Sequence, residues 1–310
     1  MATQIFSSFE AFFAANQHSN LRGMVLGRQH EDWELTHLIV NNLSVQWGRA
    51  GASVIVEGGA RAGGVSIFVP TQGWTGVSGN GHQFDESSLM VNVPGAEFCI
   101  ANDASRRWFS VYVPSETLAR ASGDAMIRPV STHGFVQLPT FRIERFRSLI
   151  GQFDEAVQQA PDAFASADAQ KAAEQKLVYE IRNLLGVLHR VEHPHGRHVL
   201  PRGEILRTCM EFVERHDGEF LSVEQLATAA GVSERTLRDV FQRYYGLAPV
   251  QYLNRRTLHQ VRKALKTADP TVATVTEIAT QFGVWQFGRL ARDYRFLFGE
   301  LPSKTLRRAA

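Results

Sequence analysis

The sequence reads SVEQLATAAGV at residues 222–232 and nearly repeats this stretch, as TVTEIATQFGV, at residues 274–284. Five of the eleven positions are identical, and three others are close exchanges: Ser for Thr, Gln for Glu and Leu for Ile. Each copy opens with a hydroxyl residue followed three positions later by Gln or Glu, which is the pattern of a capping box. Each closes on a glycine, Gly231 or Gly283, four residues after a small alanine. The pattern predicts a helix, a left-handed turn and a second helix, written twice.

The second helix of each copy is expected to be amphipathic. In SERTLRDVFQRYY, residues 233–245, a rotation of about 100° per residue gathers Leu237, Val240 and Phe241 on one face. In WQFGRLARDYRFLF, residues 285–298, the same rotation gathers apolar residues from Phe287 to Phe298. The residues on the opposite faces are the expected base contacts: Arg235, Arg238, Asp239, Gln242, Trp285, Gln286, Arg289 and Arg292.

Arg and Gln are side chains that pair with guanine and adenine edges. A single helix with such a face is more simply a solvated surface helix, but two copies at matching spacing favour a nucleic-acid reader. For Trp285, packing against a neighbouring helix is an equal alternative to contact with DNA.

The repetition continues beyond the second helix of each copy. YGLAPVQYLNRR at 245–256 and FGELPSKTLRR at 298–308 share an aromatic–Gly step, a later Pro, and then Leu and paired Arg. The offset between the copies grows from 52 to 53 residues, which predicts a second turn one residue longer than the first. An unbroken helix is expected over 250–266, between the two units.

These features resemble the AraC/XylS family of transcriptional regulators, over roughly residues 204–308. The resemblance implies two helix-turn-helix motifs that enter successive major grooves of double-stranded DNA, and RNA polymerase as a further partner. The pair Phe287–Gly288 departs from the polar residues common there in the family. The residues expected to contact phosphates are Arg243, Arg255, Arg256, Arg295 and Lys304.

Charge divides the chain in the same place. The net charge of the 310 residues is +2, but residues 196–310 hold 18 Lys and Arg against 12 Asp and Glu. The remainder is acidic, so the basic part is the one expected to meet a phosphate backbone. The N-terminus lacks the pattern of a signal peptide, no run suits a membrane span, and Cys99 and Cys209 fit a reducing compartment. We expect a cytoplasmic protein.

The first 140 residues are expected to form a β-rich domain. Short segments such as LSVQWGR, VSIFVP and WFSVYVP alternate with Gly-rich turns, which is typical of a small barrel or sandwich. Next to a DNA-binding unit of this kind, the domain resembles the family's sensor, often a cupin-like barrel that binds a small molecule. The aromatic candidates for a ligand pocket are Trp47, Trp74, Phe84 and Trp108, for which a place in the core is the commoner alternative.

Residues 141–192 are expected to be helical. Leu177, Ile181, Leu184, Leu185 and Leu188 form an apolar stripe. The stripe can pack onto the β-rich domain or form a homodimer seam through the 171–190 helix, and the pattern alone leaves both open. Pro, Gly and polar residues then mark a linker at 193–203, before the helical unit of 204–310.

No pattern of an enzyme or a metal site is found. The histidines of the β-rich part, His30, His37, His82 and His133, lack the spacing of a metal-dependent cupin. The tight cluster HPHGRH, residues 193–198, falls in the linker, and no Gly-x-Ser-x-Gly elbow is present. We therefore expect an α+β regulator without catalytic residues, metal or cofactor. A scaffold that uses the helical repeat for protein contacts, and an enzyme, are the competing classes.

Overall fold

The computed structural model describes residues 3–15, 21–71, 73–122, 134–160, 162–188 and 202–308. The chain folds into two compact units, one of which contains residues 1–23, 31–51 and 56–196, and the other residues 24–30, 52–55 and 197–310. Most of the linker expected at 193–203, its histidine cluster and His133 lie outside the described residues.

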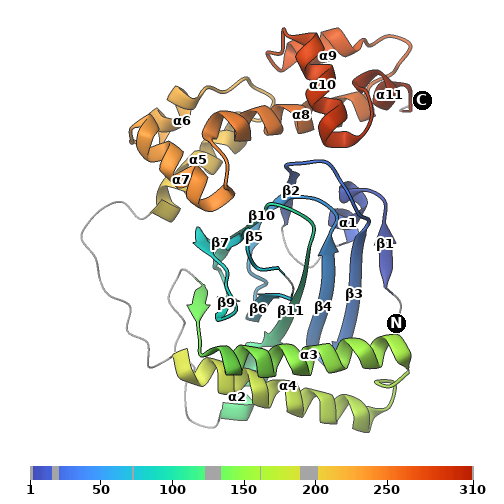
Figure 1. The fold of residues 1–310 in the computed structure, drawn as a ribbon, viewed down its shortest axis with the longest axis vertical. Helices are drawn as coiled ribbons and strands as arrows, with labels where there is room; N and C mark the ends of the chain where they lie inside the picture. Colours follow the sequence, from blue (N-terminus) through green and yellow to red (C-terminus); the bar gives the residue numbers. More distant parts are fainter. Residues whose placement is uncertain are drawn as a thin grey trace. The chain divides into compact units, whose positions relative to one another are not determined.

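The strands all lie in the first half of the chain (Figure 1). Their bounds are β1 Gln4–Phe6, β2 Arg22–Val25, β3 Trp33–Val40, β4 Leu43–Ala50, β5 Val54–Gly59, β6 Gly64–Pro70, β7 Val77–Gly79, β8 His82–Gln83, β9 Ser88–Asn92, β10 Glu97–Asn102, β11 Arg106–Pro114 and β12 Phe135–Gln137. The helices are α1 Phe9–Ala15, α2 Ser115–Ser122, α3 Thr140–Gln159, α4 Ala167–Leu188, α5 Arg202–Arg215, α6 Val223–Ala229, α7 Glu234–Tyr245, α8 Pro249–Thr267, α9 Val275–Gln281, α10 Phe287–Phe298 and α11 Pro302–Arg307.

The described strands form two sheets. One has the order β1-β3-β4-β11-β6-β9-β12, and every neighbouring pair in it is antiparallel. The other has the order β2-β5-β10-β7-β8. The α+β class is confirmed, but within these residues the strands do not close into a single barrel.

The core of the first unit lies between the seven-stranded sheet and two helices. Side chains alternate between the two faces of a strand, so Leu43, Val45 and Trp47 of β4 all point to one side. That side is covered by α3 and α4, which run next to each other in Figure 1. Phe109 of β11 meets Phe146 of α3 edge to face, with ring centroids 5.6 Å apart.

The apolar stripe of the 171–190 segment belongs to this core. Leu177 and Ile181 are fully buried, and Leu184 and Leu185 are buried almost as completely, all in the cluster that joins α4 to the sheet. The stripe therefore packs onto its own domain, and it is not available as the dimer seam we expected. The homodimer itself stays a prediction. The side chain of Leu188 lies outside the described residues.

The second unit contains the tandem helical repeat, α5 to α11. The helix expected over 250–266 is α8, Pro249–Thr267. Among the described residues, no helix is both long and apolar enough to cross a membrane.

Replacing Ile181 by Ala should lower the free energy of unfolding of the first unit by roughly 2–5 kcal/mol, because it leaves a cavity in a packed core. Urea unfolding of the full chain, followed by hydrogen exchange of peptides from α4, measures this loss. Tyr179→Ala is the control, since that side chain is 55% exposed on the same helix. A sedimentation change for Ile181→Ala without loss of stability would restore the stripe as a seam.

Candidate DNA interface and cavity

The first helix-turn-helix consists of α6 and α7. Ser222 Oγ accepts a hydrogen bond from Gln225 N at 3.2 Å, and Gln225 Oε1 accepts one from Ser222 N at 2.8 Å. This capping box starts α6, and the turn after it uses Gly231 in the left-handed region, with φ of 65°. Ser233 then caps α7 by accepting a hydrogen bond from Thr236 N. The start of α6, the turn and the start of α7 are thus each fixed by a local hydrogen bond or backbone angle.

The second helix-turn-helix, α9 and α10, uses the same devices with one difference. Thr274 and Glu277 form the capping box, and Gly283 has φ of 73°. Five residues separate α9 from α10, against four between α6 and α7, so the predicted extra residue is confirmed. No side chain caps α10, where Gln286 is the N-cap residue.

The buried faces of α7 and α10 hold each helix against α8. Leu237, Val240 and Phe241 of α7 are fully buried. Leu290, Tyr294 and Leu297 of α10 are buried as well, whereas Phe287, expected on the apolar face, is 36% exposed. Tyr294 donates its hydroxyl proton to Thr305 Oγ1 at 2.8 Å and accepts from Arg262 of α8 at 3.4 Å. Because these faces of α7 and α10 are buried, the exposed sides of the two helices are the opposite ones.

Every residue expected to contact bases is exposed, and all but Trp285 and Gln286, which precede α10, lie on those two helices: Arg235, Arg238, Asp239, Gln242, Trp285, Gln286, Arg289 and Arg292. Trp285 is 71% exposed, so the alternative in which it packs against a neighbouring helix is not observed. Contact of these residues with DNA stays a prediction.

Asp293 links two of the α10 arginines. Its carboxylate lies 3.4 Å from Arg289 Nε and 3.1 Å from Arg292 Nε. It also acts on Arg255 of α8, whose pKa burial lowers and Asp293 raises. These pairs are largely exposed and individually weak, but they orient two donors that otherwise rotate freely.

The residues expected to contact phosphates divide into two groups. Arg243, Arg295 and Lys304 are exposed, and Arg255 is half-buried with its guanidinium 5.7 Å from the Phe296 ring. They stay candidates for phosphate.

Arg256 is different, because it points inward and is not placed to contact a phosphate as expected. It is 8% exposed and donates to three backbone carbonyls, those of Val213, His216 and Glu219, and to the Asp217 carboxylate. These contacts fasten α8 to the end of α5 and to the segment that follows it, so Arg256 has a structural role. The pattern of paired arginines did not reveal this, because an outward and an inward arginine look the same in sequence.

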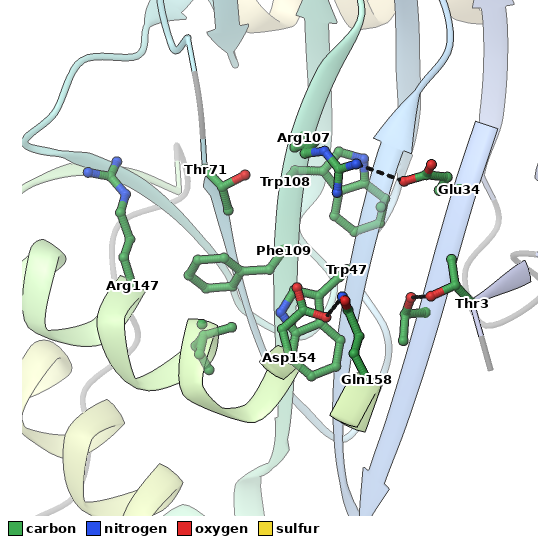
Figure 2. A pocket seen from close by; sticks show the side chains of 14 residues that line it. Thr3, Glu34, Trp47, Thr71, Arg107, Trp108, Phe109, Arg147, Asp154 and Gln158 are labelled. Carbon is green, nitrogen blue, oxygen red and sulfur yellow. Dashed lines mark hydrogen bonds and ion pairs between the residues drawn. The ribbon is translucent and has the colours of Figure 1, made fainter. Parts of the chain in front are cut away.

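The first unit contains a cavity of about 380 Å³ between α3 and the seven-stranded sheet (Figure 2). Of the four aromatic candidates, Trp47 and Trp108 line it and Trp74 and Phe84 do not. Phe84 is buried in a small second cluster with Val77, against which Trp74 packs. The structure therefore brings only two of the four together.

The cavity also has lining residues that sequence reasoning missed. On α3 these are Arg147, Ile150, Gly151, Asp154 and Gln158. Their spacing of three and four was a usable signal, because it places them on one helix face. Polar residues on a helix face are ordinarily assigned to solvent, and for that reason sequence reasoning did not assign this face of α3 to a cavity.

Comparisons with known proteins agree with the helical repeat. The family described as "Helix-turn-helix domain" matches residues 226–308. The chain is 28% identical over 248 residues to a XylDLEGF operon transcriptional activator of Pseudomonas putida, covering 76% of this chain and 71% of that one. It is 39% identical over 99 residues to XylDLEGF operon transcriptional activator 3 of the same organism, covering 32% and 30%.

A solved structure gives a further match to part of the chain. It is that of a probable AraC family transcriptional regulator from Rhodopseudomonas palustris, which is 36% identical. The match covers 34% of this chain and 96% of that one, with a TM-score of 0.31.

Arg289→Ala should lose about 1–3 kcal/mol of binding free energy at one base position, because its exposed guanidinium faces away from the core. The matched variant on the same helix is Arg295→Ala, which should weaken all sequences alike and reduce the salt slope by about 1. Affinities for single-base variants of a bound duplex, measured at several salt concentrations, separate the two. A uniform loss for Arg289→Ala would make that residue a backbone contact.

Arg256→Ala should lower the free energy of unfolding of the second unit by about 2–3 kcal/mol, since hydrogen bonds to a charged group are lost and buried carbonyls stay unpaired. Arg255→Ala, its neighbour, should have a smaller effect. Hydrogen exchange of α5 and α8 peptides in urea measures both. Equal stability of the two variants would contradict the structural role.

Proposed function

Because this chain belongs to the AraC/XylS family of transcriptional regulators, we propose that it reads two successive major grooves of duplex DNA and is controlled by a small molecule. Double-stranded DNA is the partner of the second unit. The first unit is the sensor. The helices expected at 141–192 belong to this first unit.

The single observation that carries the proposal is the placement of the two recognition helices on α8. Tyr252, in the first half of α8, stacks edge to face on Phe241 of α7. Arg262, in the second half, contacts Tyr294 and Phe298 of α10. Nineteen residues of helix span about 28 Å. Successive major grooves on one face of DNA repeat about every 34 Å, so α8 is of comparable length, and as one rigid helix it fixes the distance between the two recognition helices.

The sensor role of the first unit is supported by its cavity and by its separation from the helical repeat. A cupin-like relationship also remains part of the proposal. Cupins are double-sheet jelly rolls, and two separate sheets without closure are compatible with that architecture.

The related proteins are transcriptional regulators, which favours a regulator over an enzyme for this chain. RNA polymerase and a second copy of the chain are further partners that we expect. Analytical sedimentation of the full chain tests the second copy directly.

Selection of bound sequences from random duplexes by the full chain tests the DNA-reading part. We expect two conserved half-sites whose centres lie about 10–10.5 base pairs apart, because both helices approach one face of the duplex. Binding should weaken steeply with salt, since released counterions contribute much of the affinity. Arg235→Ala should remove conservation from one half-site, and Arg292→Ala from the other. A bound pool without sequence preference would favour the scaffold alternative.

A further inference from the structure

Arg147 of α3 has two buried N–H groups without an acceptor. Its Nε and Nη2 atoms are out of contact with solvent and have no hydrogen-bond partner among the described residues. These atoms form one edge of the guanidinium, and that edge binds both oxygens of a carboxylate. Buried donors are nearly always paired in native proteins, so this edge lacks an acceptor, which the described residues do not supply.

The rest of the guanidinium is held in place. Nη1 donates to the Glu86 carbonyl at 3.1 Å, and the group lies 4.4 Å from the centre of the Trp74 ring. In the described chain no carboxylate comes within ion-pair distance of it. Burial lowers the pKa of Arg147, while Glu144, Asp85 and Glu86 act from farther away and raise it. Arg147 is therefore a fixed, half-buried cation that lacks a close counter-charge.

The other charged residues of the cavity are already partnered. Glu34 pairs with Arg49 and with Arg107, whose Nη2 lies 3.1 Å from Glu34 Oε2. Asp154 accepts a hydrogen bond from Gln158 at 2.9 Å. Figure 2 shows the Arg107–Glu34 pair on one side of the cavity and Arg147 on the other, the side of Thr71. Gln158 is a neutral partner, so the lining cation that has no carboxylate partner among the described residues is Arg147.

The remaining walls suit an apolar body. Phe109 and Ile150 are almost fully buried and line the cavity from the sheet and from α3. Trp47, 8% exposed, adds a ring and one more donor, because its Nε1 has no described acceptor. Cavities of roughly 300–1,000 Å³ with apolar walls and a few fixed polar groups are typical of small-molecule sites, and this one has about 380 Å³.

From these observations the geometry points to a binding site for a small organic acid in the space between α3 and the seven-stranded sheet. Its carboxylate binds side-on to Nε and Nη2 of Arg147, and its apolar body lies against Phe109, Ile150 and the Trp47 ring. A second acceptor on the ligand reaches Trp47 Nε1. The site lies on the helix-covered face of the sheet, and the Trp74 ring, which packs against the Phe84 cluster, lies against the Arg147 guanidinium at its edge. Only the consequence for DNA binding rests on the proposed function.

Calorimetric titration of the full chain with two acids and their neutral amides tests the site. The probes are hexanoate and cyclohexanecarboxylate, hexanamide and cyclohexanecarboxamide, and inorganic phosphate. We expect each acid to bind at least about tenfold more tightly than its amide, because a charge-assisted bidentate pair is lost in the amide. Equal affinity of acid and amide, binding of phosphate alone, or no binding of either acid at millimolar concentration would overturn the site.

Three variants locate the binding. Arg147→Gln should abolish the preference for acid over amide, whereas Arg142→Gln, on the same helix but outside the cavity, should retain it. Trp47→Phe, which changes the apolar wall and leaves the cation, should weaken each acid and its amide alike and keep the preference for the acid. Hydrogen exchange of α3 peptides checks that Arg147→Gln is folded, and if it is not, the acid-to-amide ratio of the unaltered chain decides. An unchanged preference in folded Arg147→Gln would contradict the assignment.

The DNA affinity of the full chain, measured with and without a bound acid, separates this site from the proposed control. A bound acid that leaves DNA affinity and specificity unchanged keeps the site and removes the control. Specific DNA binding by a chain that binds no acid keeps the DNA reader and removes the site.

Discussion

The packing of two recognition helices onto one continuous helix is the constraint on which the second unit depends. Leu253, Leu258, Val261 and Leu265 form the buried stripe of α8. Because α8 is unbroken, the two helix-turn-helix motifs cannot turn independently about it without losing that packing. Buried Arg256 adds polar contacts that an apolar stripe cannot provide, since it donates to one carbonyl near the end of α5 and to two carbonyls that follow α5. A rigid spacing between two exposed basic faces is the physical requirement for reading repeated grooves.

The first unit uses its seven-stranded sheet for two purposes. Over most of its helix-covered face, alternate apolar residues pack tightly against α3 and α4. Near Arg147 and Trp47 the packing gives way to a cavity with unpaired donors. Such donors destabilise a folded chain unless something accepts from them. The same sheet face thus combines a stabilising core with a cavity whose unpaired donors a bound ligand can satisfy.

The accuracy of sequence reasoning differed between the two units for a physical reason. Capping boxes, turn glycines and the longer second turn depend on residues within a few positions of each other, and the structure contains them all. The longer strands β4, β6 and β11 were recognised in the sequence, but short strands such as β7 and β8 gain their stability from partners far along the chain. For the same reason the stripe through Leu177 and Ile181 was readable as apolar, while its partner was not.

The sequence by itself determined the tandem helix-turn-helix, its exposed arginines and the division between a basic and an acidic part. These follow from local hydrogen bonding, helical periodicity and charge, all of which are properties of neighbouring residues. Only the tertiary structure decided that Arg256 points inward, that the α4 stripe is covered by its own domain, and that Arg147 and Trp47 share a cavity. Those outcomes depend on which distant segments pack together. Burial and hydrogen-bond pairing are set by that packing and not by the residue type.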